Sequence, residues 1–353
     1  MGGRDRVFLL MGLVTLALAV AACGGGTPSS RAADKVHVEP EVNFALPSPT
    51  MGCQGATSLP GGGSRLPLKV STKAGQVAEA VNVCIDDKGP FPFVLDSGAG
   101  ESTIDAHLAK RLHLQTDGPP SQFAGVGCTG TARPVLVTRW NVEGLDLARQ
   151  QLTAATLPGI GGKGEPDGLL GSDVLSRFGA VRVDFQAGEL LVPGPEGAAP
   201  SGSTPVAGPV GPPPSPVLTG NGQGSTIPLV VTTIPGDVSL NVAVHFGTGP
   251  DKMFTVDTGS SQSVVSTSVA RSQSLAHTDL ASRQATVCST ITVPLVHSGP
   301  WSLPSFPLSP QLLGATGFGD VGAGGIEGLL GSDQLRRYGW VVFDYAGGRI
   351  VLG

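Results

Sequence analysis

The sequence predicts an all-β fold, made mostly of β-strands with short helices and arranged as two similar halves. The 353 residues include 53 Gly and 30 Pro but only 5% aromatic residues, a composition that suits strands joined by many turns. Short apolar runs bounded by turn residues recur along the chain. Long segments of the second half also repeat the first half in the same order.

The repeat consists of three ordered matches with nearly constant spacing. The matched pairs are Asp96 with Asp257, "DGLLGSDVLSRFG" (167–179) with "EGLLGSDQLRRYG" (327–339), and "VRVDFQAGELLV" (181–192) with "VVFDYAGGRIVL" (341–352). The offset is 161 residues for the first pair and 160 for the other two (257 − 96, 327 − 167 and 341 − 181). Because chance does not keep three matches in order with a one-residue drift, the chain is an internal duplication.

Each half is expected to contain mainly strands. In the first half, strands at 77–84 and 93–95 flank a turn at 86–89, and in the second half strands at 238–246 and 253–256 flank a turn at 247–250. Helical spacing of apolar residues predicts a helix over 104–114. The two "LLGSD" segments each end a strand and open a short helix, and each half closes on a hairpin with Gly at its turn.

These patterns predict five segments. Residues 1–22 form a signal peptide and 23–64 a flexible tether rich in Gly, Ser, Pro and Ala. Residues 65–193 form the N-terminal lobe and 225–353 the C-terminal lobe. Residues 194–224, which include "GPVGPPPSP", form a linker that cannot build a packed core.

The N-terminus has the pattern of an export signal. Arg4 and Arg6 precede an apolar run at 7–20 that is short for a membrane span, and small residues then lead to Cys23. This ending resembles a bacterial lipobox, which implies that Cys23 is lipidated and holds the protein at the extracytoplasmic face of the cell membrane. The alternative is an ordinary secretory signal with a coincidental cysteine.

Charge and motifs narrow the possible partners. The net charge is −5 and no Lys/Arg run is present, so nucleic acid is not an expected partner. There is no C-x-x-C pair for zinc, and we find no motif of a metalloprotease, a serine hydrolase or a nucleotide-binding loop. We therefore expect no metal and no cofactor. We also expect the protein to be a monomer.

The chemistry is expected at two related loops. "VLDSGAGEST" (94–103) and "TVDTGSSQSV" (255–264) each place an aspartate after an apolar strand. If the halves are related by a pseudo-two-fold axis, Asp96 and Asp257 meet there, share one proton, and act as general base and general acid. Gly98 and Gly259 would allow the close approach, and the Ser97 and Thr258 hydroxyls would brace the opposite loops.

These motifs resemble the aspartic protease superfamily. Apolar-Asp-Ser/Thr-Gly occurs twice, and each copy is followed by apolar-apolar-Gly and a short helix, as in tandem retropepsin-like lobes joined into a pepsin-like bilobal chain. The resemblance implies two lobes with a cleft between them and an aspartic endopeptidase that hydrolyses an extended peptide or protein substrate. The alternative is an inactive relative, a lipoprotein that binds peptides or a protein partner.

The resemblance also implies flaps that cover the substrate. No tyrosine stands where pepsins carry one in the flap, so the flaps are sought at "GVGCTG" (125–130) and "ATVCST" (285–290). The flap residues expected to contact substrate are Gly125, Val126, Gly127, Cys128, Val287 and Cys288. Because Ser260 replaces Ala99 after the second loop's glycine, we expect a hydroxyl near Asp257 alone, which would favour ionisation of Asp257.

Four cysteines remain after Cys23, namely Cys53, Cys84, Cys128 and Cys288. In an oxidising compartment they predict two disulfides with three possible connectivities, although four free thiols are the alternative. Cys128 and Cys288 are repeat-equivalent and both fall in the expected flaps. A Cys128–Cys288 bridge is therefore one hypothesis, with Cys53–Cys84 following from it; the others join Cys128 to Cys84 or Cys53.

Overall fold

We describe the fold from a computed structural model. The described residues are 37–38, 53–60, 62–73, 76–157, 166–194, 206–207, 218, 224–247, 249–318 and 325–353. The expected signal peptide, Cys23 and most of the expected tether and linker lie outside them. Within the described part of the chain, no helix is long and apolar enough to cross a membrane.

The first half forms an eleven-stranded sheet. Its strands are β4 (Lys69–Lys73), β5 (Gln76–Ile85), β6 (Lys88–Leu95), β7 (Thr103–Asp105), β8 (Gln115–Thr116), β9 (Ser121–Gly125), β10 (Cys128–Val137), β11 (Trp140–Val142), β12 (Leu145–Leu147), β13 (Gln150–Ala155) and β14 (Gly168–Leu170). The order is β12-β11-β5-β6-β14-β7-β13-β10-β8, with β4 added to β5 and β9 to β10. Between them stand the helices α1 (Ala106–Arg111), α2 (Ser172–Leu175) and the 3₁₀ turn η1 (Ser176–Phe178).

The second half forms most of a twelve-stranded sheet of the same design, to which β1 (His37–Val38) and β17 (Val206–Ala207) are added from outside residues 225–353. Its strands are β1 (His37–Val38), β17 (Val206–Ala207), β19 (Val230–Ile234), β20 (Asp237–Phe246), β21 (Lys252–Asp257), β22 (Val264–Ser266), β23 (His277–Ala285), β24 (Thr290–His297), β25 (Trp301–Leu303), β26 (Phe306–Leu308), β27 (Leu312–Thr316) and β28 (Gly328–Gly331). The order is β1-β23-β24-β27-β22-β28-β21-β20-β19-β17, with β25 on β20 and β26 on β25. The short helices are α4 (Thr267–Ser272), α5 (Ser332–Leu335) and η2 (Arg336–Tyr338).

The two sheets share an unusual central arrangement. β14 is parallel to β6 on one side and antiparallel to β7 on the other, and β28 has the same relation to β21 and β22. β13 is in turn parallel to β7, as β27 is to β22. Since both halves repeat this mixed order, the duplication in the sequence is also a duplication of topology.

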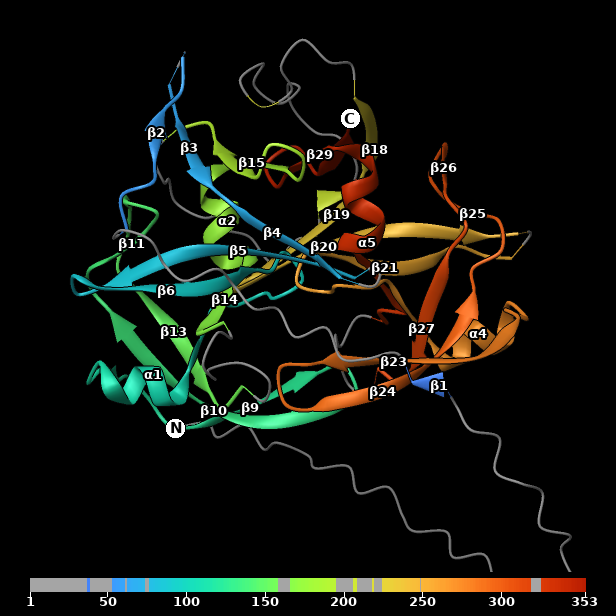
Figure 1. Ribbon diagram of the computed structural model, residues 1–353, viewed down its shortest axis with the longest axis horizontal. Coiled ribbons are helices and arrows are strands. Elements are labelled where there is room, and N and C mark those ends of the chain that lie inside the picture. Colours follow the sequence, from blue (N-terminus) through green and yellow to red (C-terminus); the bar gives the residue numbers. More distant parts are fainter. Residues whose placement is uncertain are drawn as a thin grey trace, which may run out of the picture. The chain divides into compact units, whose positions relative to one another are not determined.

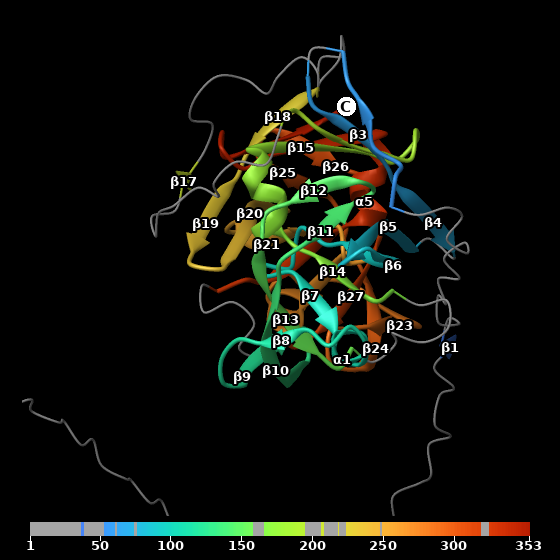
Figure 2. The same cartoon turned by 90° about the vertical axis from the view of Figure 1, so that its left-hand side faces the viewer.

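A third sheet joins the halves. It is formed by β2 (Thr57–Ser58), β3 (Ser64–Pro67), β15 (Ala180–Asp184), β16 (Glu189–Val192), β18 (Ser225–Pro228), β29 (Trp340–Asp344) and β30 (Arg349–Leu352). Their order is β18-β30-β29-β15-β16-β3-β2, so the closing hairpins of the two halves pair through β15 and β29. In Figures 1 and 2 this sheet lies at one end of the described fold, and the hairpins β9–β10 and β23–β24 lie at the other.

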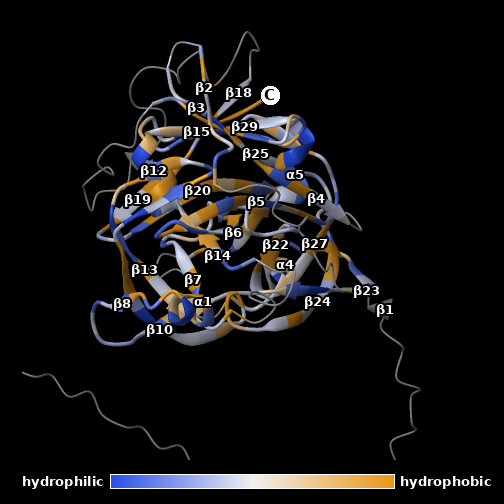
Figure 3. Ribbon diagram, turned by 60° about the vertical axis from the view of Figure 1, so that its left-hand side comes forward, coloured by the Kyte–Doolittle hydropathy of each residue, from blue (hydrophilic) through white to orange (hydrophobic). Residues whose placement is uncertain are grey.

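Apolar strands form the core between these ends. Phe93 and Leu95 of β6 are fully buried, as are Phe254 and Val256 of β21. Figure 3 shows hydrophobic residues along β6 and β14 in the middle of the fold. Both strands become more buried toward the aspartate: β6 begins with exposed Lys88 and Gly89 and ends on buried Leu95, and the last four residues of β21 are all buried. The aspartates that follow β6 and end β21 therefore stand at the buried ends of these strands.

The all-β prediction is confirmed, and both closing hairpins form. The predicted turn at 86–89 is shorter than expected: Asp86 and Asp87 alone make it, with φ of 49° and 61°, a left-handed pair that matches strand twist. The domain boundaries at 65–193 and 225–353 stay predictions.

The predicted helix over 104–114 is wrong at both ends. Ile104 belongs to β7, and the α1 helix begins only after Asp105, whose Oδ1 accepts hydrogen bonds from the His107 and Leu108 amides at 2.9 and 3.2 Å. The helix ends at Arg111. An N-cap carboxylate thus fixes the start of the helix, which apolar spacing alone placed two residues early.

Candidate active site

The first aspartate loop begins where β6 ends. The Asp96 amide donates to the Leu170 carbonyl at 2.9 Å, which continues the parallel pairing of β6 with β14. Asp96 Oδ1 accepts hydrogen bonds from the Gly98 amide at 3.0 Å and the Ala99 amide at 2.8 Å. The loop therefore curls around one carboxylate oxygen.

The second loop has the same construction. Asp257 is the last residue of β21 and stands beside Gly331 of β28. Its Oδ1 accepts a hydrogen bond from the Ser260 amide at 3.0 Å. Asp96 and Asp257 are buried, and their carboxyl groups lie close enough for each to shift the pKa of the other. The structure thus brings together the two aspartates that the sequence singles out.

Glycine is required beside each aspartate. A Cβ atom at Gly98 would lie 2.6 Å from Asp257 Oδ1, and one at Gly259 would lie 2.5 Å from Asp96 Oδ1. Both separations are shorter than a methyl group tolerates. Each glycine therefore packs against the carboxyl group of the opposite loop, and any side chain there would drive the two carboxyl groups apart.

Four reciprocal hydrogen bonds lock the loops together. The Ser97 amide donates to Thr258 Oγ1 at 2.9 Å, and the Thr258 amide donates to Ser97 Oγ at 3.1 Å. Each hydroxyl then donates to a strand of the other half: Ser97 Oγ to the Val256 carbonyl at 2.9 Å, and Thr258 Oγ1 to the Leu95 carbonyl at 2.7 Å. All these groups are buried, so every donor finds its acceptor inside the protein.

The pair of carboxyl groups holds a proton tightly. Burial raises the pKa of both Asp96 and Asp257 above the ordinary value. The negative charge of Asp96 raises the pKa of Asp257 further, while backbone amides oppose the rise in both loops: Ala99 and Gly98 for Asp96, and Ser260 and Gly259 for Asp257. Two like charges this close cannot both persist, so the pair keeps one proton between its two carboxyl groups.

The expected role of the Ser260 hydroxyl is wrong. Ser260 Oγ donates to the Gln262 carbonyl at 2.7 Å, and it is the Ser260 amide that contacts Asp257. Ala99 supplies the equivalent amide to Asp96. Because the loop turns the Ser260 side chain toward its own backbone, the serine at this position gives Asp257 no additional hydrogen-bond donor.

A second pair of buried carboxyl groups supports the loops. Asp173 Oδ1 accepts from Ser102 Oγ at 2.6 Å, and Asp333 Oδ1 accepts from Ser263 Oγ at 2.7 Å. Gln150 and Gln311 donate to the other oxygens at 3.0 and 2.9 Å. Burial raises the pKa of both carboxyl groups to about 6. They connect the start of each short helix to the segment that follows the aspartate loop.

The residues expected to form flaps lie at the tips of two hairpins. Gly125 ends β9, Val126 and Gly127 make the turn, and Cys128 begins β10. Gly127 has φ of +70°, a left-handed conformation that suits glycine. Val287 and Cys288 lie in the loop between β23 and β24. The six residues therefore occupy equivalent places in the two halves.

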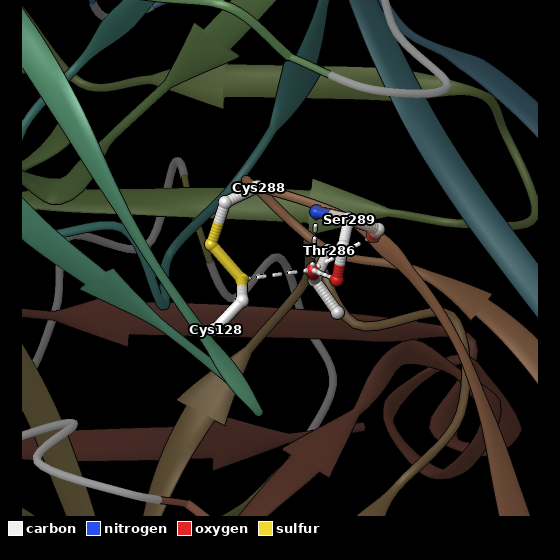
Figure 4. Close-up of a disulfide and its surroundings, with 4 residues drawn as sticks. All are labelled: Cys128, Thr286, Cys288 and Ser289. Carbon is white, nitrogen blue, oxygen red and sulfur yellow. Dashed lines mark hydrogen bonds between the residues drawn. A yellow bond between two sulfur atoms is a disulfide. The ribbon is translucent and has the colours of Figure 1, made fainter.

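A disulfide joins the hairpin tips. Cys128 and Cys288 are bonded, with their Cα atoms 6.0 Å apart, as the repeat-equivalence hypothesis expected. Figure 4 shows the bridge beside Thr286, whose Oγ1 lies 3.2 Å from Cys128 Sγ and accepts from the Ser289 amide at 3.1 Å. Cys53 is bonded to Cys84 of β5, with Cα atoms 5.9 Å apart, and attaches the start of the first half to its sheet.

Each tip also packs on the opposite half. Val287 lies against an apolar cluster of the first half, and Val126 lies against one of the second half. The first cluster contains Ala132, Ala155 and Leu157 with Phe123, and the second contains Val264, Phe318 and Leu329 with Ile326. Each hairpin tip therefore places its valine in an apolar cluster of the opposite half, and the Cys128–Cys288 disulfide links the two tips in this arrangement.

Four other residues of the site were not singled out from the sequence. Ser172 and Ser332 hold the carbonyls of Ser97 and Thr258, and they in turn contact Tyr345 and Glu79. The two serines stand at the same place in the repeated "LLGSD" segments, so the repeat carried a signal for them. Among the described residues, no group of three or more His, Cys, Asp or Glu side chains is placed to hold a metal ion.

Comparison with known families agrees with this geometry. A family model described as aspartyl protease matches residues 81–174, which span β6, the Asp96 loop, the β9–β10 hairpin and β14. A search of curated proteins found no match to the chain. The chain therefore has an aspartic-protease-like fold, and the family match lies in the first half.

The disulfide pairing is directly testable. Proteolytic mapping of the non-reduced protein should yield a peptide pair that links Cys128 to Cys288 and another that links Cys53 to Cys84. Both linkages should disappear on reduction. Recovery of Cys128 linked to Cys53 or Cys84 would contradict the arrangement of the hairpin tips.

Proposed function

We propose that the protein is an aspartic endopeptidase, anchored to the membrane by lipid at Cys23 and acting on the extracytoplasmic side. The observation that carries the proposal is the opposed pair Asp96 and Asp257, which are buried, electrostatically coupled to each other and built into equivalent loops. The substrate would be an extended peptide segment held between the two halves under the hairpin tips.

The protonation of the pair supports hydrolysis without a covalent intermediate. The Asp96 carboxylate accepts a proton from a water molecule, whose oxygen bonds to the carbonyl carbon, while Asp257 gives its proton to the carbonyl oxygen. The tetrahedral diol then loses a hydroxyl proton to Asp257. Asp96 gives its new proton to the amide nitrogen as the C–N bond breaks, and both aspartates return to their initial states.

The other loop residues would act through the aspartates. Ser97 and Thr258 hold the two loops at a fixed separation, and Gly98 and Gly259 allow that separation to be short. Val126, Val287 and the bonded cysteines would contact or gate the substrate. No metal or cofactor takes part in this scheme.

A second candidate function rests on the bonded hairpin tips. With Val126 and Val287 seated on the opposite halves, the disulfide favours a closed arrangement. Such a protein could bind a peptide or a partner at the envelope without cleaving it. The variants below separate the two functions, since only hydrolysis requires both aspartates.

Asp96→Asn and Asp257→Asn should each lower peptide hydrolysis by at least about 1,000-fold, and the double variant should be no worse than either one, because the two residues act as one unit. Cleavage of a peptide library at pH 4 to 7 measures this. Asp146→Asn, at an exposed carboxylate on β12, is the control. Substantial activity in either single variant would contradict the shared-proton mechanism.

Opening the Cys128–Cys288 bridge should increase cleavage of large substrates severalfold, because the hairpin tips then separate. The measurement compares Cys128→Ser/Cys288→Ser with the unaltered protein on a denatured protein and on a short peptide. The matched control, Cys53→Ser/Cys84→Ser, removes the other disulfide. An equal effect of the two double variants would argue against gating by the tips.

Cys23→Ala should release the protein from the membrane or leave it as an unprocessed precursor, because lipid addition at this residue is the proposed anchor. Mass spectrometry of the mature N-terminus and membrane fractionation test it. An unmodified N-terminus that begins at a residue other than Cys23 would refute the anchor while leaving the catalytic proposal untouched.

A further inference from the structure

Two repeat-equivalent serines, Ser172 and Ser332, each form a hydrogen bond with the aspartate loop of their own half. Ser172 Oγ lies 2.8 Å from the Ser97 carbonyl oxygen, and Ser332 Oγ lies 3.1 Å from the Thr258 carbonyl oxygen. Both serines are fully buried. A carbonyl oxygen only accepts hydrogen bonds. Each serine hydroxyl must therefore donate its single proton to the carbonyl of the residue that follows the aspartate, Ser97 or Thr258.

Each serine hydroxyl has a second partner, which comes from the opposite half. Ser172 Oγ lies 2.9 Å from the Tyr345 hydroxyl, and Ser332 Oγ lies 2.9 Å from Glu79 Oε2. Since the Ser172 proton is used, the Tyr345 phenol must be the donor to Ser172. Burial raises the pKa of that phenol above its ordinary value, so the donor is present at every physiological pH.

The two outer partners do not come from equivalent positions. The register of β5 on β6 and of β20 on β21 makes Leu240 the equivalent of Glu79, because Ala80 pairs with Val94 as Asn241 pairs with Thr255. The closing hairpins make Phe185 the equivalent of Tyr345. Each half has therefore acquired one polar group, at a different place, that reaches the serine of the other half.

Glu79 can replace the phenol only if its carboxyl group is protonated. An ionised carboxylate accepts but does not donate, so Ser332 would have one proton for two acceptors, Glu79 Oε2 and the Thr258 carbonyl. Glu79 is fully buried, and within the described residues its Oε1 has no hydrogen-bond partner. A buried carboxylate with one oxygen unpartnered is costly, whereas the neutral acid satisfies both contacts.

We propose that Glu79 is a protonated positioning residue, which donates to Ser332 so that Ser332 can hold the Thr258 carbonyl and hence the Asp257 loop. The first half uses the Tyr345 phenol for the same purpose on the Asp96 loop. The role for catalysis rests on the proposed function, but the protonation of Glu79 and its contact with Ser332 do not.

The charges around Glu79 are few. On η2, Arg336 lowers the pKa of Glu79 by its positive charge, and its Nη1 donates to Thr72 Oγ1 at 3.0 Å. On β4, Lys69 donates to Asn82 Oδ1 at 3.0 Å. On α5, Asp333 accepts from Ser263 and Gln311. Burial outweighs the charge of Arg336 and raises the pKa of Glu79 to about 8.

This pKa sets a pH window for stability. Between the ordinary value of 4.5 and about 8, the folded protein keeps a proton on Glu79 that the unfolded chain has lost. The stability that this proton supports is complete below 4.5 and is lost as the pH rises to about 8. Asp173 and Asp333, with pKa values of about 6, contribute mainly at lower pH. The Asp96–Asp257 pair, whose pKa values are also raised, is present in both the unaltered protein and Glu79→Gln, so the difference between these two proteins from pH 6 to 8 reports Glu79.

Thermal unfolding tests the protonation without any need for activity. The melting temperature of the unaltered protein should fall relative to that of Glu79→Gln between pH 6 and pH 8, by on the order of 5–10 °C, and the difference should level off above pH 8. The side-chain amide introduced by Glu79→Gln donates to Ser332 at every pH. Melting temperatures that run parallel over this range would overturn the protonated state.

Kinetics test the positioning role. Glu79→Leu and Tyr345→Phe each install the residue that the other half carries, and each removes one donor while keeping an apolar contact. Both should lower kcat roughly tenfold or more at pH 5 with little change in KM, and Glu79→Gln should recover most of the kcat lost in Glu79→Leu. Full kcat in Glu79→Leu, or no recovery in Glu79→Gln, would overturn the role.

The two readouts separate this inference from the proposed function. If the unaltered protein and Asp96→Asn are equally inactive on all peptides, the endopeptidase proposal fails. The pH-dependent difference in melting temperature between the unaltered protein and Glu79→Gln still decides whether Glu79 is the protonated donor to Ser332.

Discussion

The close approach of Asp96 and Asp257 is the constraint on which the rest of the site depends. Two carboxyl groups buried side by side repel each other when ionised, so the surrounding structure must hold them together. The reciprocal hydrogen bonds of Ser97 and Thr258 do this directly, and each hydroxyl is anchored to a strand carbonyl of the other half. The proton shared by the pair is a consequence of that enforced proximity.

Support for the loops is arranged in successive layers. The glycines let the carboxyl groups approach, the serines of α2 and α5 fix the loop carbonyls, and Asp173 and Asp333 fix the segments that follow. Tyr345 and Glu79 then cross from one half to the other. The bonds between Ser97 and Thr258, the glycine contacts and the contacts of Tyr345 and Glu79 cross between the halves, so each loop depends on the other half for its geometry.

The sequence predicts the parts of this site that the duplication repeats. Asp96 and Asp257, their glycines and hydroxyls, and the Cys128–Cys288 bridge all follow from equivalent positions in two copies. It does not predict Glu79 or Tyr345, since their equivalents Leu240 and Phe185 are apolar and no pattern marks them. The sequence does not predict the orientation of the Ser260 hydroxyl, because that orientation depends on a local backbone turn. It places the start of α1 too early, because the Asp105 cap outweighs apolar spacing.

The pairing of β15 with β29 has a consequence for how the two halves assemble. Arg182 stands opposite Val342, its own repeat-equivalent, and the register is symmetric on either side: Ala180 faces Asp344 as Asp184 faces Trp340. This is the isologous contact of a two-fold homodimer, formed within one chain. The covalent connection between the halves therefore raises their effective concentration rather than defining their geometry. Two copies in one chain are free to diverge in sequence. Arg182 lies 4.4 Å from the ring centre of Trp340, whereas the repeat-equivalents of these two residues are Val342 and Ala180, so this contact occurs once rather than twice.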